Sequence, residues 1–392
     1  MATYRAAILG VGPRGLKHGR AYRQHPRIDL VALCDVDAAR LAHASQELGV
    51  ERTYGDYREM LDREDPDIVS IPTRTDLHAP LTMGVLAHRP PRAIDVEKPM
   101  ATSLDDADRM VAEAARTGTL LAVHHQFRCT PPFRVAARMI KAGEIGPITT
   151  IKLRGKGYYG GYDLMNIGTH RLNGTRAFLG RARSVSAICT TAGEPTGPEG
   201  VIAGPYGFGW IAGENISAVY DFEGGGTVFA EFHRRSESNT GWGHIKIYGE
   251  DGAICLYNQQ NMQVRRGRDW RVEDVNWELL ELTPADRILH GVDYLDEPGG
   301  DLWMADETVH ALDQDRPHEN SGEEGLAVME MLLGAWESHF TERRVRFPMG
   351  RGAHPLLQAR TQAGLGEPDR APMALRYPEW LPGELARIGA DH

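Results

Sequence analysis

The 392-residue sequence has few cysteines and lacks a long apolar run. Its four cysteines, Cys34, Cys129, Cys189 and Cys255, show neither CxxC nor Cys/His spacing. We therefore expect buried, reduced thiols, a cytoplasmic protein and no metal site. No segment approaches the roughly 20 apolar residues that span a bilayer, and the N-terminal apolar stretch is too short for a signal sequence.

Basic residues are also in deficit. The sequence has 44 Lys and Arg against 54 Asp and Glu, a formal charge of −10. Nucleic acids and anionic membranes attract basic surfaces, so this balance argues against both as partners. The remaining composition, 41% hydrophobic and 25% charged, is typical of a globular protein, and the length suffices for two domains.

The first 128 residues alternate short apolar runs with amphipathic stretches. Strands are predicted at 5–10, 28–35, 66–73, 92–97 and 119–126, with helices between them. Such alternation is typical of βαβ units. It predicts an α/β, doubly wound parallel sheet covered by helices on both faces.

The pattern changes in residues 129–348. Several β-like runs between 183 and 275 are separated by glycine turns such as EGGG and GEDG, and a helix is predicted near 322–340. This favours an α+β domain whose sheet is mostly antiparallel. Residues 349–392, rich in Pro, Gly and Arg, are predicted to form an extended C-terminal arm.

A glycine motif lies between the first strand and the first helix. Gly10, Gly12 and Gly15, with Pro13 and Arg14 between them, form G-x-G-x-x-G. In a dinucleotide site the first glycine permits the tight turn, the second lets the backbone approach a pyrophosphate, and the third allows close helix–strand packing. The helix N-terminus then offers free amides to the phosphates.

Asp35 ends the second strand, 20 residues after Gly15. This is the interval expected of a carboxylate that accepts hydrogen bonds from the ribose hydroxyls. Because a carboxylate repels a 2′-phosphate, the expected cofactor is NAD rather than NADP. Asp35 as a plain helix N-cap is the competing interpretation, and the two roles can coexist.

Glu97 and Lys98 stand at the end of a predicted buried strand, directly before Pro99. Ligands of a doubly wound sheet bind at this edge, which explains two charges at that position. Lys98 is a candidate acid/base because partial burial can lower a lysine pKa toward neutrality. A surface ion pair is the alternative.

Residues 5–348 resemble the Gfo/Idh/MocA oxidoreductases. The matching segments are GVGPRG (10–15), IPTRTDLH (71–78), VEKP (96–99), HHQFRCTPPF (124–133), KAGEIGPI (141–148), GGYDLMNIGTH (160–170) and RVRFP (344–348). The resemblance implies a Rossmann domain, a second domain with an open-faced antiparallel sheet, and a homodimer or homotetramer. It also implies hydride transfer between nicotinamide C4 and a carbinol carbon of a carbohydrate or polyol substrate.

The resemblance also assigns residues. It puts Lys98 beside the reacting hydroxyl and Thr73, His78, Glu97 and Gln126 along the cofactor.

The family often carries D-x-G-x-H on the first helix of the second domain. Here Asn166 replaces the aspartate, His170 is retained, and a later Asp is Asn173. Spacing of i, i+4 predicts Asn166 and His170 on one helix face. Asn can bind a hydroxyl but cannot relay a proton, so Lys98 and His170 are expected to share the acid/base work.

Other candidate substrate ligands flank this motif. Tyr158, Tyr159 and Asp163 precede it, and Arg234 and Arg235 end a later β-like run. Tyrosines suit sugar rings and hydroxyls, and tandem arginines suit a carboxylate or sulfonate. Core packing and a solvated sheet edge are the alternative interpretations.

Two enzyme hypotheses follow. The first is an NAD-dependent sugar or glycoside dehydrogenase. The second is an NAD-dependent glycosidase, which oxidises the sugar at C3, eliminates the aglycone, adds water and reduces the ketone again. The first hypothesis is preferred. The asparagines at 166 and 173 and the 191–213 insertion, which could cover a larger substrate, keep the second as the alternative. A cofactor-binding regulator without catalysis is the third, disfavoured by the presence of both Lys98 and His170.

Overall fold

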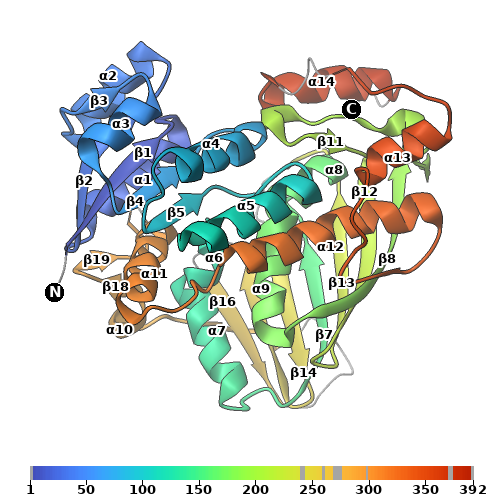
Figure 1. Ribbon diagram of the computed structural model, residues 1–392. Coiled ribbons are helices and arrows are strands. Elements are labelled where there is room, and N and C mark those ends of the chain that lie inside the picture. Colours follow the sequence, from blue (N-terminus) through green and yellow to red (C-terminus); the bar gives the residue numbers. More distant parts are fainter. Residues whose placement is uncertain are drawn as a thin grey trace. The chain divides into compact units, whose positions relative to one another are not determined.

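The computed structural model describes residues 3–238, 243–257, 261–267, 276–296, 299–369 and 374–389 (Figure 1). Contacts divide the chain into two compact units. The first contains Met1–Thr130 and Thr283–Leu326, and the second contains Pro131–Leu282 and Ala327–His392. The predicted domain of residues 1–128 therefore lacks a segment, 283–326, that packs with it.

The first unit is built on a six-stranded sheet, in which every neighbouring pair of strands is parallel. Its order is β3 (Thr53–Tyr54), β2 (Ile28–Cys34), β1 (Tyr4–Leu9), β4 (Ile68–Ile71), β5 (Ala93–Val96) and β6 (Leu120–Val123). The strand order reverses between β1 and β4, where ligands of such sheets bind. The predicted doubly wound α/β domain is confirmed.

Helices follow the strands of this sheet. They are α1 (Pro13–Gln24), α2 (Ala38–Leu48), α3 (Tyr57–Glu64), α4 (Thr75–His88), α5 (Leu104–Thr117) and α6 (Gln126–Cys129). The chain later returns to this unit with α10 (Pro284–Arg287), β18 (Ile288–Leu289), β19 (Val292–Asp293) and α11 (Gly300–Gln314). Helix α11 packs against α1 and α6, and its Ala305 and Val309 join the core around β1 and β2.

The second unit contains a long mixed sheet. Its order is β17 (Glu278–Leu280), β16 (Asn261–Arg266), β15 (Gly252–Tyr257), β14 (His244–Gly249), β7 (Ile148–Arg154), β13 (Thr227–His233), β12 (Asn215–Phe222), β8 (Ala182–Thr191) and β20 (Val345–Arg346). Strand β9 (Glu194–Pro195) also pairs with β8. All of these pairings are antiparallel except β7 with β13. A mostly antiparallel sheet is therefore confirmed.

Helices cover one face of this sheet, as Figure 1 shows for α7 (Pro131–Lys141), α9 (Thr169–Leu179) and α12 (Gly322–Thr341). The hydroxyl of Tyr220 on β12, for example, donates to the carbonyl of Met331 on α12. The opposite face leaves Ile188, Val219 and Phe229 exposed by 63%, 40% and 44%. The sheet is open-faced, as the family resemblance implied.

The C-terminal segment differs from the predicted extended arm. It contains α13 (Pro355–Gln362) and α14 (Tyr377–Arg387), which pack on the 191–213 insertion near β10 (Ile202–Ala203) and β11 (Trp210–Ile211). Trp380, 5% exposed, donates its indole N–H to the carbonyl of Ala203 at 3.2 Å. Each helix has a proline in its first turn, where no intrahelical N–H bond is lost, and α14 also accommodates Pro382 in its interior.

None of the helices in the described part of the chain is both long enough and apolar enough to cross a bilayer.

Candidate active site

The glycine loop between β1 and α1 has the predicted geometry. Gly10 has φ +106°, and a Cβ there would lie 2.6 Å from the Thr73 methyl. A Cβ on Gly15 would lie 2.1 Å from the Gly10 carbonyl oxygen, so this residue is required for close helix–strand packing. A Cβ on Gly12 would meet no atom within 4 Å. The loop therefore leaves space beside Gly12, where a dinucleotide's phosphates would approach the backbone.

Asp35 lies at the end of β2, next to this loop. Its Oδ2 accepts the N–H of Val11 at 2.9 Å, and its Oδ1 accepts the N–H of Asp37 at 2.9 Å. The N-cap of α2 is Asp37, which accepts from Ala39 and Arg40. The N-cap interpretation of Asp35 is therefore wrong. Each Asp35 oxygen retains a lone pair for a hydroxyl donor.

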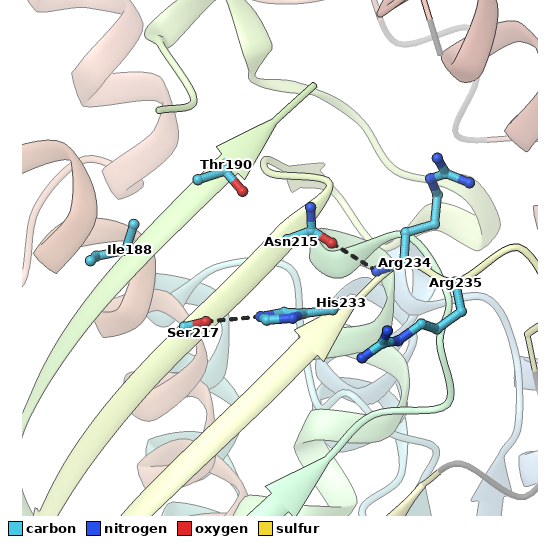
Figure 2. Close-up of a pocket in the computed structure, with 7 residues that line it drawn as sticks. All are labelled: Ile188, Thr190, Asn215, Ser217, His233, Arg234 and Arg235. Atoms are coloured by element: carbon cyan, nitrogen blue, oxygen red, sulfur yellow. Dashed lines mark hydrogen bonds between the residues drawn. The ribbon is translucent and has the colours of Figure 1, made fainter. Parts of the chain in front are cut away.

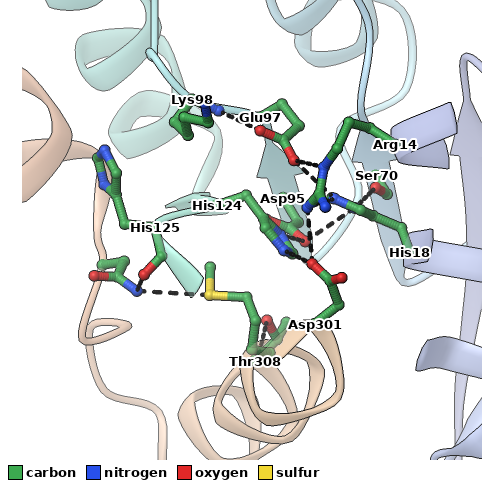
Figure 3. Close-up of polar contacts among 12 residues, drawn as sticks. Arg14, His18, Ser70, Asp95, Glu97, Lys98, His124, His125, Asp301 and Thr308 are labelled. Carbon is green, nitrogen blue, oxygen red and sulfur yellow. Dashed lines mark hydrogen bonds and ion pairs between the residues drawn. The ribbon is translucent and has the colours of Figure 1, made fainter. Parts of the chain in front are cut away.

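Arg14, in the first turn of α1, is held by two carboxylates (Figure 3). Its Nε donates to Glu97 Oε1 at 2.5 Å, and its Nη2 donates to Asp301 Oδ1 at 2.8 Å. The other Glu97 oxygen accepts the backbone N–H of Lys98 at 3.0 Å. Burial would raise the pKa of Glu97, but Arg14 and neighbouring His18 hold it well below its usual range. Glu97 thus remains a carboxylate that links the glycine loop to the lysine.

A buried histidine joins the same network. His124 Nδ1 lies 2.8 Å from Asp95 Oδ2, and its Nε2 lies 2.8 Å from Asp301 Oδ1. Burial alone would lower the pKa of His124, but the two carboxylates raise it to about 10. His18 stacks on this ring with centroids 3.9 Å apart, and burial together with the His124 charge lowers its pKa. His124 is therefore an imidazolium at neutral pH and His18 a neutral imidazole.

Sequence reasoning missed Asp95, His124 and Asp301 as parts of this network. Asp95 and His124 sit inside strand-like runs beside the predicted site, so a charged residue in a buried strand was the available signal. No local pattern predicted the role of Asp301, because this residue lies on α11, 177 residues after His124.

The first unit also contains Lys98 and the other predicted cofactor residues, Thr73, His78 and Gln126. The lysine is half-buried and precedes a cis peptide bond to Pro99. His78 is fully buried, with its ring nitrogens 2.9 Å from the Pro99 carbonyl oxygen and 3.1 Å from that of Thr73. It therefore braces two loops of the site. Gln126 Oε1 is buried and has no hydrogen-bond partner among the described residues.

These features fit a dinucleotide. The space beside Gly12 can take the phosphates, and the carboxylate of Asp35 can accept hydrogen bonds from ribose hydroxyls. The unpartnered amide oxygen of Gln126, in the same unit, can accept a hydrogen bond from an amide group. The guanidinium of Arg14 is already paired with Glu97 and Asp301, so it is not available to attract a 2′-phosphate. The residues around the loop therefore favour NAD over NADP.

In the second unit, Asn166 and His170 lie on consecutive turns, but the first turn is not α-helical. Residues Leu164–Gly168 form a π-helix, and α9 begins at Thr169. Asn166 is half-buried and donates its Nδ2–H to the hydroxyl of Tyr162 at 3.2 Å. His170 is 7% exposed. The expected regular helix is corrected to a π-bulge, a feature frequent at functional sites.

The predicted substrate ligands before this motif, Tyr158, Tyr159 and Asp163, are mostly buried. Asp163 is fully buried and accepts the N–H of Gly157 at 3.1 Å. Burial raises the pKa of Asp163 to about 7, although backbone N–H groups and Arg171 oppose the shift. Tyr159 is also fully buried, so it packs in the core of this unit. Tyr158 is half-buried and remains accessible.

The predicted arginine pair lies at the open face of the sheet, where a hollow of about 260 Å³ is found (Figure 2). It is lined by Ile188, Thr190, Asn215, Ser217, His233, Arg234 and Arg235. Arg234 Nε pairs with Glu214 Oε1 at 2.5 Å, and its backbone N–H donates to Asn215 Oδ1. Arg234 is therefore already neutralised, which weakens its predicted role as a substrate anchor.

Within the part of the chain that the structure describes, two residue groups have metal-ligating side chains close together. His18, Glu97 and His124 belong to the buried network above, where Arg14, Asp95 and Asp301 already satisfy the charges.

The second group is His25, His290 and Asp306. His25 Nδ1 accepts the N–H of Arg27, so the His25 ring proton is on Nε2, 3.2 Å from Asp306 Oδ1. Neither group needs a metal to explain its contacts, and the absence of a metal site stays a prediction.

The fold and the glycine loop define a dinucleotide-binding protein of the Rossmann class with a second, open-faced sheet domain. Residues 4–125 match the oxidoreductase family with an NAD-binding Rossmann fold, and residues 137–347 match its C-terminal alpha/beta domain. The chain belongs to the Gfo/Idh/MocA family of oxidoreductases, and its cofactor is NAD.

Three comparisons show the range of relatives. The chain is 38% identical to a D-apiose dehydrogenase of Paraburkholderia graminis over 143 residues, which cover 36% of this chain and 38% of that enzyme. It is 23% identical to the D-apiose dehydrogenase of Rhizobium rhizogenes over 364 residues, 88% of this chain and 98% of that enzyme. A solved levoglucosan dehydrogenase in complex with NADH and levoglucosan has a TM-score of 0.73 at 20% identity, covering 88% of this chain and all of that one.

Proposed function

We propose that this protein is an NAD-dependent dehydrogenase that oxidises a carbinol carbon of a sugar, glycoside or related polyol. The observation that carries the proposal is the connection of the NAD-type loop to the lysine: Arg14 binds Glu97, and Glu97 binds the N–H of Lys98. Relatives named for D-apiose and levoglucosan support a carbohydrate substrate.

The residues divide the chemistry between them. Bound NAD supplies a hydride acceptor at nicotinamide C4. Lys98 accepts the proton of the reacting hydroxyl, and His170 assists as a second acid/base group. Asn166 binds a hydroxyl without exchanging a proton, since an amide has no suitable pKa. Thr73, Gln126 and Asp35 hold the cofactor.

The test is NADH formation, followed by absorbance with NAD and a panel of sugars, polyols and glycosides. Lys98→Ala is expected to abolish turnover while binding NAD as the wild type does. Lys141→Ala, at an exposed lysine on α7, is the matched control and is expected to keep full activity. An active Lys98→Ala variant would remove the lysine from the mechanism.

The glycosidase hypothesis uses the same first oxidation and is favoured by Asn166, which stands where relatives often carry a proton-relaying aspartate. Its signature is release of aglycone without accumulation of NADH, because the ketone is reduced again. Measuring both products on the same glycosides separates the two activities. Neither product on any substrate would favour the cofactor-binding regulator.

We also propose a cytoplasmic homo-oligomer whose copies meet at the open face of the sheet. Register pairs Val219 with Phe229 and Ser217 with Ile188, which gathers the exposed apolar side chains on one face. Contiguous exposed apolar groups of this kind favour a protein interface. Phe229→Asp is expected to lower the mass in sedimentation, whereas a wild-type monomer would contradict the assembly.

A further inference from the structure

The C-terminal segment, described over residues 349–369 and 374–389, lies beyond the family match, which ends at residue 347. Helix α14 of this segment nevertheless packs against the residues that lead into Asn166 and His170. Its anchor is the 191–213 insertion: the N–H of Tyr206 donates to the Leu375 carbonyl at 3.0 Å, and Trp380 donates to the Ala203 carbonyl. The segment is thus an integral part of the second unit.

Tyr377, the first residue of α14, makes the central contacts. Its hydroxyl oxygen accepts the backbone N–H of Tyr159 at 2.8 Å. Its ring stacks on Tyr162 with centroids 4.3 Å apart and an interplanar angle of 23°, and meets the edge of Tyr158 at 4.9 Å. Tyr377 is 6% exposed, so its side chain is buried among these contacts and that with Trp380.

Tyr162 transmits this packing to the motif. Phe208, from the insertion, stacks on the Tyr162 ring at 5.3 Å and 29°. With Tyr377 also stacked on it, the Tyr162 ring is held by two segments distant in sequence. The Tyr162 hydroxyl accepts the Nδ2–H of Asn166 at 3.2 Å. That bond fixes which end of the Asn166 amide is the donor toward Tyr162, and it directs Oδ1 to other donors.

We propose that Tyr377 is a positioning residue for substrate binding, acting through Tyr162 on the amide of Asn166. The inference rests on the proposed function, in which Asn166 binds a substrate hydroxyl. An oriented Oδ1 accepts a hydrogen bond from that hydroxyl without first losing side-chain freedom, so the C-terminal segment lowers KM for substrates with a hydroxyl at this position. The segment outside the family match thereby contributes to the choice of sugar.

The experiment compares full-length variants on the best sugar of the panel. Tyr377→Leu removes the stacked ring, and Tyr377→Phe keeps the ring but removes the acceptor for Tyr159. We expect Tyr377→Leu to raise the sugar KM about tenfold, with a smaller change in kcat and an unchanged Kd for NAD. Tyr377→Phe should raise KM less. Leu375→Ala, at a residue 40% exposed in the same segment, is the control and should change neither constant.

A double-mutant cycle distinguishes positioning from general destabilisation. In an Asn166→Ala background, Tyr377→Leu should have little further effect on KM, since the amide that it orients is gone. Independent effects, or an unchanged KM in the single Tyr377 variants, would overturn this inference while leaving the dehydrogenase intact. If Tyr377→Leu fails to fold, the Tyr377→Phe cycle decides by the same criterion. A wild type without NADH formation on any sugar would instead refute the proposed function, and this inference with it.

Discussion

The guanidinium of Arg14 lies 2.8 Å from the carboxylate of Asp301, a residue 287 positions later in the sequence. This ion pair ties the glycine loop to α11, the helix with which the chain returns to its first unit. The same Asp301 oxygen lies 2.8 Å from His124 Nε2. Asp301 thus holds two cations through one carboxylate oxygen, and the cofactor loop depends on a residue outside the predicted first domain.

Asp301→Asn tests that dependence. The variant keeps the shape of the side chain but leaves Arg14 and the buried His124 without a shared counter-charge. We expect the free energy of unfolding to fall by about 3 kcal/mol in denaturant titrations. Asp315→Asn, at an exposed residue that caps the end of the same helix, should stay within about 0.5 kcal/mol of wild type. Equal stability of both variants would show that the network contributes nothing.

The stability of the protein should depend on pH through His124. Its pKa is raised above the ordinary histidine value to about 10, so its ionic contribution is complete below pH 6.5 and is lost as the pH rises toward 10. The unfolding free energy of wild type is expected to fall over that range more steeply than that of His124→Gln. Parallel pH profiles would mean that His124 is not held as a cation.

Two glycines of the loop should separate cofactor binding from folding. Gly15→Ala puts a Cβ 2.1 Å from a backbone oxygen, so it should lower the unfolding midpoint. Gly12→Ala meets no protein atom within 4 Å and keeps an allowed backbone conformation. It should unfold like wild type yet bind NAD at least about tenfold more weakly, because the methyl group occupies the phosphate approach. Wild-type NAD affinity in Gly12→Ala would contradict the loop's role.

Cofactor preference should follow the charge at the end of β2. Val36, beside Asp35, is 94% exposed and tolerates a longer side chain. The double variant Asp35→Ser/Val36→Arg removes the carboxylate and adds a cation for a 2′-phosphate, so the ratio of the NADP and NAD dissociation constants should shift toward NADP. Val36→Arg alone is the control and should retain NAD preference. An unchanged ratio in the double variant would remove Asp35 from cofactor discrimination.

Local patterns in the sequence predicted much of this architecture. Gly10, Gly12, Gly15 and Asp35 have fixed spacing within one βαβ unit, so their geometry follows from short-range rules. The open face of the second sheet came from family resemblance and agrees with the exposure of Ile188, Val219 and Phe229. Prediction succeeded where the relevant contacts are local or where the family repeats them.

Long-range contacts were beyond reach. The sequence around Asp301 does not indicate that α11 packs next to Arg14. The Pro, Gly and Arg content of the C-terminal segment did not predict its two helices, of which α14 buries Tyr377 and Trp380. The π-helix at Asn166 was also missed, because a single inserted residue in a helical turn leaves no clear periodicity. Such features depend on tertiary packing, which overrides local sequence preference.

The most direct test of the central claim is a crystal structure with NAD bound. We expect the pyrophosphate beside Gly12, the adenosine ribose on Asp35, and the nicotinamide ring next to the Lys98 side chain. A bound cofactor whose nicotinamide lies away from Lys98, or a first unit that takes up no NAD, would contradict this claim.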